Sequence, residues 1–160
     1  MNDINGLDLQ DIISNSINEV FETMLSMKVE VSNDDSPIVE GKSRIVGSVS
    51  FAGTAMGNIN IHVGDSFARL MTAAILGMEL EEIEGEEEVK DVVGELSNMI
   101  GGALKSRLCD SGFPCELSIP SVVSGEKFNV ESMGWARQAR FAFRHEQHTA
   151  FAEVFMNASK

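Results

Sequence analysis

The sequence predicts an α+β fold, in which an antiparallel sheet of about six strands packs against long helices. Two long stretches repeat apolar residues at helical spacing, and several short stretches alternate apolar and polar residues as strands do. The strands follow one another in runs and do not strictly alternate with the helices, which is typical of this class. At 160 residues, 43% of them apolar, the chain can bury a core, and we expect one domain over residues 1–160.

The first predicted helix spans residues 8–27. Asp8 is the expected N-cap, because its side chain can accept a hydrogen bond from the first free backbone amides. Apolar residues recur at three- and four-residue intervals and form one face of this helix, which consists of Leu9, Ile12, Ile13, Ile17, Val20, Phe21, Met24 and Leu25. Residues 28–31 then alternate like a short strand, and residues 32–37, read SNDDSP, have the composition of a turn.

A β-hairpin is predicted next. Residues 44–51 and 56–63 alternate apolar and polar side chains, and Gly53 with Thr54 forms the turn between them. The apolar positions of the two strands are Ile45, Val49, Phe51, Ile59, Ile61 and Val63. We therefore expect the two strands to pair in antiparallel order.

A shorter helix follows the hairpin. Asp65 or Ser66 can cap its start, and Gly77 is expected to end it, because glycine readily adopts the left-handed conformation found after helices. Residues 79–88 then hold seven glutamates among ten residues. Such a stretch is typical of a solvated linker, and its negative charge suits the N-terminal end of the next helix.

Residues 86–108 have the strongest helical pattern in the chain. The apolar side of this helix consists of Val89, Val92, Val93, Leu96, Met99, Ile100, Ala103 and Leu104. Away from that side, Asp91, Glu95, Asn98 and Gly102 share a narrow sector. Asn and Gly are poor helix formers, so this sector suggests a function, although a solvent-facing helix with an incidental Asn explains the bare spacing as well.

The remainder of the chain is predicted to be mostly strands. The predicted strands or strand pieces are residues 115–119, 122–123, 127–130, 138–144 and 149–156. Residues 131–135 are predicted to form a loop. The last two strands are expected to pair around residues 145–148. Phe141 and Phe143 share one face, and Phe151 and Phe155 share another.

Charge and cysteine content narrow the function classes. The formal net charge of −13 argues against nucleic acid and anionic membranes as partners, because both would repel the chain. The negative charge suits a partner with basic residues, or it serves solubility.

No apolar run is long enough to span a bilayer and no signal peptide precedes the first helix, so we expect a cytoplasmic protein. Cys109 and Cys115 fit no zinc or CxxC spacing and are expected to be free thiols.

The sequence lacks the residue patterns of several common types of active site. His62, His145 and His148 are the only histidines, and their spacing does not favour a metal site, so none is expected. The sequence holds no GxSxG elbow for a nucleophilic serine and no glycine-rich phosphate loop. We therefore expect neither a metal nor a covalent nucleophile in this chain.

The helix at residues 86–108 and its surroundings resemble the CheC/CheX/FliY family of bacterial chemotaxis phosphatases, and CheX in particular. The family signature is an acidic residue or Ser, three residues, Glu, two residues, Asn, and a Pro about two dozen residues further on. Asp91, Glu95, Asn98 and Pro120 match it, and the segments NEVFETML, FAGTAMGNINIHV and AILGMEL are also similar. The 21 residues between Asn98 and Pro120 are one fewer than in the family pattern, which indicates a deletion in the loop after the helix.

This resemblance implies a hydrolase that removes the phosphoryl group from the aspartate of a CheY-like response regulator. Glu95 would pair with the regulator's active-site Lys, and Asn98 would position the attacking water. Asp91 would add a supporting contact or helix-start electrostatics, and Gly102 would let the partner come close. The regulator would supply Mg²⁺, so no cofactor is expected in this chain. The resemblance also implies one active site per chain and a homodimer formed through sheet edges.

One alternative belongs to a different class of function. The same fold also serves as a non-catalytic binding module in flagellar switch proteins, so the chain could dock a response regulator or a motor component without acting on it. The pair Glu95 and Asn98 favours catalysis, because an adaptor has no need of the amide. A regulator that bound tightly without a change in its phosphorylated lifetime would favour the adaptor.

Overall fold

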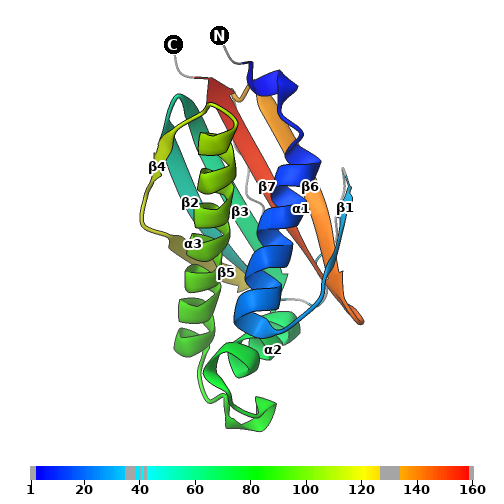
Figure 1. Ribbon diagram of the computed structural model, residues 1–160. Coiled ribbons are helices and arrows are strands. Elements are labelled where there is room, and N and C mark those ends of the chain that lie inside the picture. Colours follow the sequence, from blue (N-terminus) through cyan, green and yellow to red (C-terminus); the bar gives the residue numbers. More distant parts are fainter. Residues whose placement is uncertain (1–2, 35–38, 40, 42, 127–133, 159–160) are drawn as a thin grey trace.

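The computed structural model describes residues 3–34, 39, 41, 43–126 and 134–158 (Figure 1). Within them, one antiparallel sheet of seven strands packs with three α-helices, which confirms the predicted α+β class with one strand more than expected. The strands are β1 (Glu30–Asn33), β2 (Ser43–Gly53), β3 (Ala55–Gly64), β4 (Cys115–Leu117), β5 (Ser121–Glu126), β6 (Arg137–His145) and β7 (His148–Ala158). The helices are α1 (Leu9–Val20), α2 (Asp65–Leu76) and α3 (Glu86–Asp110).

The sheet joins two long hairpins. The strand order is β1-β6-β7-β3-β2, and β4 and β5 both pair with β2 at the outer edge. The hairpins β2–β3 and β6–β7 meet where β3 pairs with β7, with Ile59 opposite Val154. At the outer edge, β4 lies opposite residues 51–53 of β2, and β5 lies opposite residues 43–48. The centre of the sheet therefore depends on pairing between residues that are 89 to 103 positions apart in the sequence.

The helices cover one face of the sheet. Figure 1 shows α1 and α3 side by side across that face, with α2 at one end. Alternate residues of the strands point into the core between the two layers, among them Ile59, Ile61 and Phe143. Phe21 and Phe143 pack with ring centroids 5.4 Å apart. Burial of this apolar surface is the main contribution to the stability of such a fold.

The first helix agrees with its prediction except in its last turn. The Asp8 side chain accepts a hydrogen bond from the Asp11 amide at 3.1 Å, as expected of an N-cap. After Val20, residues Phe21–Leu25 continue as a π-helical turn. The chain leaves the helix at Ser26, whose φ of 54° lies in the left-handed region.

The predicted cap of α2 is wrong. Gly64 is the N-cap residue and has no side chain that could cap the helix, and Asp65 and Ser66 are already its first two helical residues. The carboxylate of Asp65 instead pairs with Arg69 one turn later, at 3.0 Å. Gly77, with a φ of 67°, ends the helix as predicted. In the glutamate-rich stretch that follows, a short 3₁₀ turn (Leu80–Glu82) precedes α3.

Some strand predictions also need correction. Ser32 and Asn33 belong to β1 and pair with β6, so the predicted turn cannot begin at residue 32. The rest of that segment at 35–37, the strand piece at 127–130 and most of the loop at 131–135 lie outside the described residues. His145 is the last residue of β6 and His148 is the first residue of β7, so the turn between the two strands is shorter than predicted.

A close approach between β2 and α3 sets the position of this helix. A Cβ atom at Gly47 would lie 2.0 Å from the Ser97 hydroxyl oxygen and 3.2 Å from the Val93 carbonyl oxygen. The backbone of α3 can therefore approach the sheet at this point only because residue 47 lacks a side chain. No helix in the described part of the chain is long and apolar enough to cross a membrane.

Candidate active site

The predicted site residues lie on the outer side of α3. The side of α3 that packs into the protein consists of Val89, Val92, Val93, Gly94, Leu96, Ser97, Ile100, Gly101, Leu104 and Leu108. Asp91 and Glu95 are exposed, and Asn98 and Gly102 are half-buried. The structure therefore brings all four to one accessible surface of a single helix, because the apolar side of α3 faces the core.

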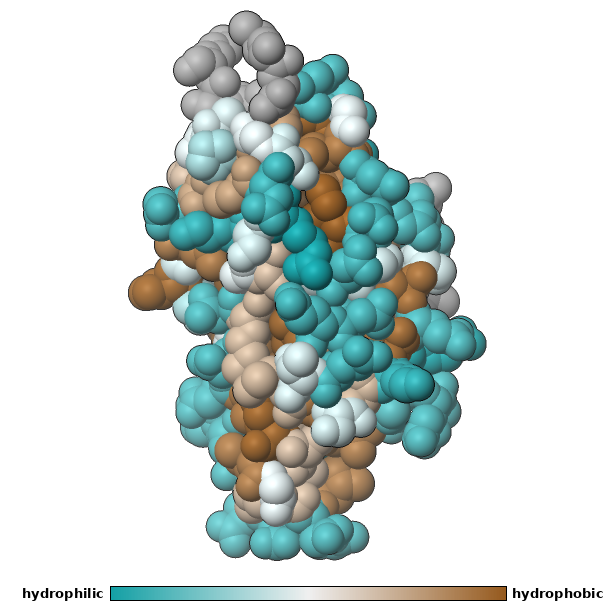
Figure 2. Space-filling view, in the orientation of Figure 1, coloured by the Kyte–Doolittle hydropathy of each residue, from teal (hydrophilic) through white to brown (hydrophobic). Residues whose placement is uncertain are grey.

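The polar side chains of this surface have no partner within the described part of the chain. Asp91, Glu95 and Asn98 make no side-chain hydrogen bond or ion pair there. Glu95 and Asn98 are three residues apart, or about 4.5 Å along the helix axis, and the hydrogen-bonded backbone holds that separation constant. In the space-filling view of this side, hydrophilic residues and smaller apolar areas lie next to one another (Figure 2). The carboxylate and the amide are thus available to a second molecule.

Three glycines of α3 have different surroundings. A Cβ atom at Gly94 would lie 3.1 Å from Val122 of β5, and one at Gly101 would lie 3.2 Å from Val49 of β2. These two positions therefore allow strands to pack closely against the helix. A Cβ atom at Gly102 would meet no atom within 4 Å. No packing within the described residues requires glycine at position 102, and its half-exposed backbone lies beside Asn98.

An ion pair ties the C-terminal half of α3 to the sheet edge. Lys105 Nζ lies 3.0 Å from Glu116 Oε2 of β4, and this hydrogen bond raises the pKa of Lys105. The helix continues to Asp110, and the Phe113 amide closes the turn with a 2.8 Å hydrogen bond to the Leu108 carbonyl. Residues 111–114 connect α3 to β4. Sequence reasoning missed Lys105, because nothing local links it to a residue eleven positions away.

The three histidines lie in different surroundings. His62 is buried and bound to Glu153, and His145 Nδ1 lies 2.9 Å from the Lys28 carbonyl oxygen. His148 stacks on Phe67 with ring centroids 5.2 Å apart. Among the described residues, no three His, Cys, Asp or Glu side chains converge as metal ligands would.

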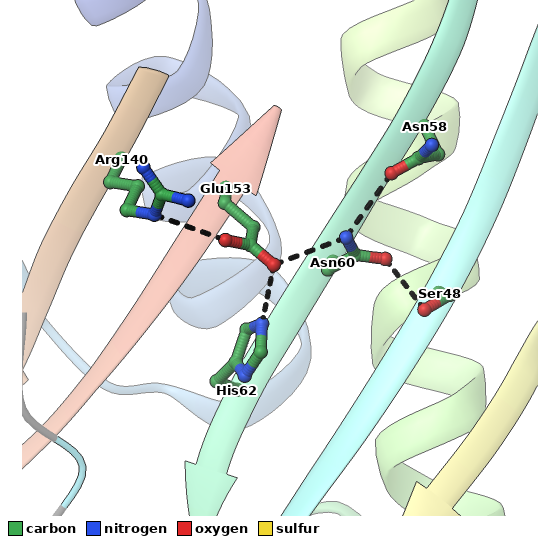
Figure 3. A network of polar contacts seen from close by, with 6 residues as sticks. All are labelled: Ser48, Asn58, Asn60, His62, Arg140 and Glu153. Carbon is green, nitrogen blue, oxygen red and sulfur yellow. Dashed lines mark hydrogen bonds and ion pairs between the residues drawn. The ribbon is translucent and has the colours of Figure 1, made fainter. Parts of the chain in front are cut away.

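A second polar cluster lies on the sheet face opposite the helices (Figure 3). Glu153 of β7 is its centre and is only 2% exposed. One carboxylate oxygen of Glu153 lies 2.8 Å from His62 Nε2 and accepts a hydrogen bond from the Asn60 amide at 3.2 Å. The other carboxylate oxygen pairs with Arg140 at 3.2 Å. Asn60 in turn accepts a 2.6 Å hydrogen bond from the Ser48 hydroxyl.

The balance of forces at Glu153 favours its ionised form. Burial disfavours the charged carboxylate, but the hydrogen bond and charge of His62, together with Arg140 and Asn60, outweigh burial and lower its pKa below the ordinary value of 4.5. The sequence offered only a weak signal for this cluster. The alternating polar residues of β3, which include Asn60 and His62, resemble an ordinary solvated strand face, and Glu153 stands alone in an apolar strand.

A protein-family model matches more than half of the chain. The model of the family described as chemotaxis phosphatase CheX matches residues 45–144, a range that includes the four candidate residues of α3. Comparison with curated proteins gives no match.

Solved structures with the same fold include chemotaxis proteins. The chemotaxis protein CheX from Vibrio vulnificus is 26% identical with a TM-score of 0.79, and the alignment covers 94% of this chain and 97% of that one. A CheC-like superfamily protein from Shewanella sp. PV-4 is 25% identical with a TM-score of 0.79, over 99% of this chain and 100% of that one. The CheX–CheY–BeF3–Mg²⁺ complex from Borrelia burgdorferi gives 18% identity and a TM-score of 0.73, over 92% and 96% of the two chains.

Proposed function

This chain belongs to the family of the chemotaxis phosphatase CheX, and we propose that it hydrolyses the phospho-aspartate of a CheY-like response regulator. The observation that supports this proposal most directly is the exposed side of α3, where Glu95 and Asn98 have no partner among the described residues. As part of the same proposal, the chain acts in the cytoplasm as a homodimer.

In the proposed reaction, the regulator supplies the phosphorylated Asp, a Mg²⁺ ion and a Lys. Glu95 forms an ion pair with that Lys and thereby aligns α3 with the regulator's active site. Asn98 hydrogen-bonds the attacking water and holds it in line with the phosphorus, so that the bond between phosphorus and the aspartyl oxygen breaks as water adds. An amide suits this task because it both donates and accepts hydrogen bonds and adds no negative charge beside the phosphoryl group.

The rigidity of α3 matters for this mechanism. Correct positioning of the reacting groups supplies most of the rate enhancement in such a reaction. A displacement of these groups by about 1 Å can lower the rate on the order of 10²-fold. Glu95 and Asn98 lie on the same helix, whose opposite side is buried against the sheet and α1, so the anchoring residue and the positioning residue move together. Asp91 is one turn before Glu95 and adds a supporting contact to the same partner.

The proposal is tested by the decay of a phosphorylated CheY-type regulator from the same cell, measured with and without this protein. Faster loss of the phosphoryl group, in proportion to catalytic amounts of the protein, is the expected result. A regulator that binds the chain in its phosphorylated form but decays at its own rate would identify an adaptor. No acceleration with any regulator of that cell would overturn the proposed activity.

Replacing Gly102 with alanine is expected to affect the stability of the fold and the binding of the regulator in opposite directions. Because a Cβ atom there meets no atom of the described chain, Gly102→Ala is expected to raise the free energy of unfolding by roughly 0.5–1 kcal/mol. The same methyl group would stand beside Asn98 and hinder the partner, so a higher regulator concentration would be needed for half-maximal stimulation of decay. Urea unfolding and regulator titrations measure the two effects.

The matched control for Gly102→Ala is Gly94→Ala, on the buried side of the same helix. There a Cβ atom would lie 3.1 Å from Val122, so no gain in stability is expected. If Gly102→Ala left the regulator concentration dependence unchanged, position 102 would not belong to the contact surface.

A further inference from the structure

The fold brings the two cysteines together. Cys109 lies in the last turn of α3, and Cys115 is the first residue of β4. Between them the chain reverses direction at Gly112, whose φ of 92° lies in the left-handed region, and the Phe113 amide bonds back to the Leu108 carbonyl. Lys105, one turn before Cys109, pairs at 3.0 Å with Glu116, the residue after Cys115, so the same two segments are held side by side and the two cysteines interact.

The two thiols differ in their access to solvent. Cys109 is half-buried, whereas Cys115 is only 5% exposed. Burial raises the pKa of the Cys115 thiol, and the neighbouring Cys109 adds to this effect. A dissolved reagent therefore reaches Cys109 first. The ammonium group of Lys105, one turn earlier on α3, interacts with both cysteines and partly offsets the effect of burial on the pKa of Cys115.

We propose that Cys109 and Cys115 are a redox-active dithiol, in which Cys109 is the attacking thiol and Cys115 the resolving one. The oxidant is a low-molecular-weight disulfide, of which oxidised glutathione is the probe. Reversible disulfides of this kind are the usual form of disulfide in reducing compartments, where they act as redox sensors.

The reaction proceeds by two thiol–disulfide exchanges. The Cys109 thiolate attacks one sulfur of the small disulfide, forms a mixed disulfide and releases one small thiolate. Cys115 loses its proton to solvent and attacks the Cys109 sulfur. The bond between Cys109 and Cys115 forms as the second small thiolate leaves and takes up a proton. The protein is oxidised by two electrons, and the small disulfide is reduced to two thiols.

The bond would link α3 to the sheet edge. Cys115 pairs with Gly53 of β2, and a Cβ atom at Gly53 would lie 2.6 Å from the Cys115 Cα, so β4 is tightly packed at this point. Oxidation would therefore tie the C-terminal turn of α3 to a fixed strand. We expect a thermal midpoint a few degrees higher, because the cross-link restricts the unfolded chain.

The test compares the folded wild type with two variants after incubation with oxidised glutathione, each analysed by intact mass. The wild type is expected to lose the mass of a pair of hydrogen atoms and to hold no glutathione. Cys115→Ser is expected to accumulate one glutathione on Cys109, because no resolving thiol remains. Cys109→Ser is expected to stay unmodified for much longer, because its remaining thiol is buried.

Two controls keep this result interpretable. The same incubation in denaturant should modify both variants alike, and circular dichroism should show that both are folded without it. Equal modification of the two folded variants would overturn the assigned order of attack. A folded wild type that kept glutathione, or that remained fully reduced under conditions that modify Cys115→Ser, would overturn the dithiol itself.

Discussion

Asn98→Ala is expected to lower the stimulated rate of regulator dephosphorylation by about 100-fold or more, towards the regulator's own decay rate. The methyl group of alanine can neither accept nor donate a hydrogen bond, so the attacking water would lose its fixed position. Asn98→Asp should also be inactive, although it keeps the shape of the side chain, because it places a negative charge beside the phosphoryl group. The measurement is the decay of the phosphorylated regulator with each variant.

The control for this substitution is Asn15→Ala, which makes the same chemical change at an exposed position of α1. Both variants should unfold at nearly the same urea concentration as the wild type, because neither asparagine is fully buried and the Asn98 side chain makes no bond within the described chain. Full activity of Asn98→Ala would contradict the role assigned to this residue. Loss of activity in Asn15→Ala would show that a second helix takes part.

Glu153→Leu is expected to lower the free energy of unfolding by about 3–5 kcal/mol, the range for the removal of one partner from a buried ion pair. His62 and Arg140 would lose their common carboxylate, and Asn60 would lose a hydrogen-bond acceptor. Glu153→Gln should cost less, because the amide oxygen can still accept a hydrogen bond. Urea unfolding at neutral pH measures both changes. Glu30→Gln, at an exposed position of β1, is the control and should change stability by less than about 0.5 kcal/mol.

The same carboxylate predicts a pH dependence. Its pKa is lower in the folded protein than the ordinary value of 4.5, so the folded form holds the proton less tightly than the unfolded chain. The resulting stability is present above pH 4.5 and is lost as the pH falls through the folded pKa. Glu153→Gln lacks this contribution, so the difference in unfolding free energy between wild type and variant should shrink below that pH. A constant difference across this range would contradict the role of the ionised carboxylate.

Local patterns in the sequence were sufficient to predict α3 and the polar residues on its outer side. The helical recurrence of apolar residues from Val89 to Leu104 determines which side of α3 is buried, so the position of Asp91, Glu95, Asn98 and Gly102 on the outside follows from spacing alone. The alternation in β2 and β3 likewise predicted a hairpin, because both strands and their turn lie within one short segment.

The tertiary structure decided what depends on segments far apart in the chain. Glu153 and His62 interact although they are 91 residues apart in the sequence, and Lys105 and Glu116 form an ion pair after the chain reverses direction. No local sequence pattern indicates either pair. The approach of Cys109 to Cys115 depends on the tight turn after α3, and the closeness of α3 to the sheet depends on Gly47. The sequence by itself determined the elements and their apolar faces, because these follow from periodicity. Only packing determined which polar groups meet, because a partner's position is set by the whole sheet.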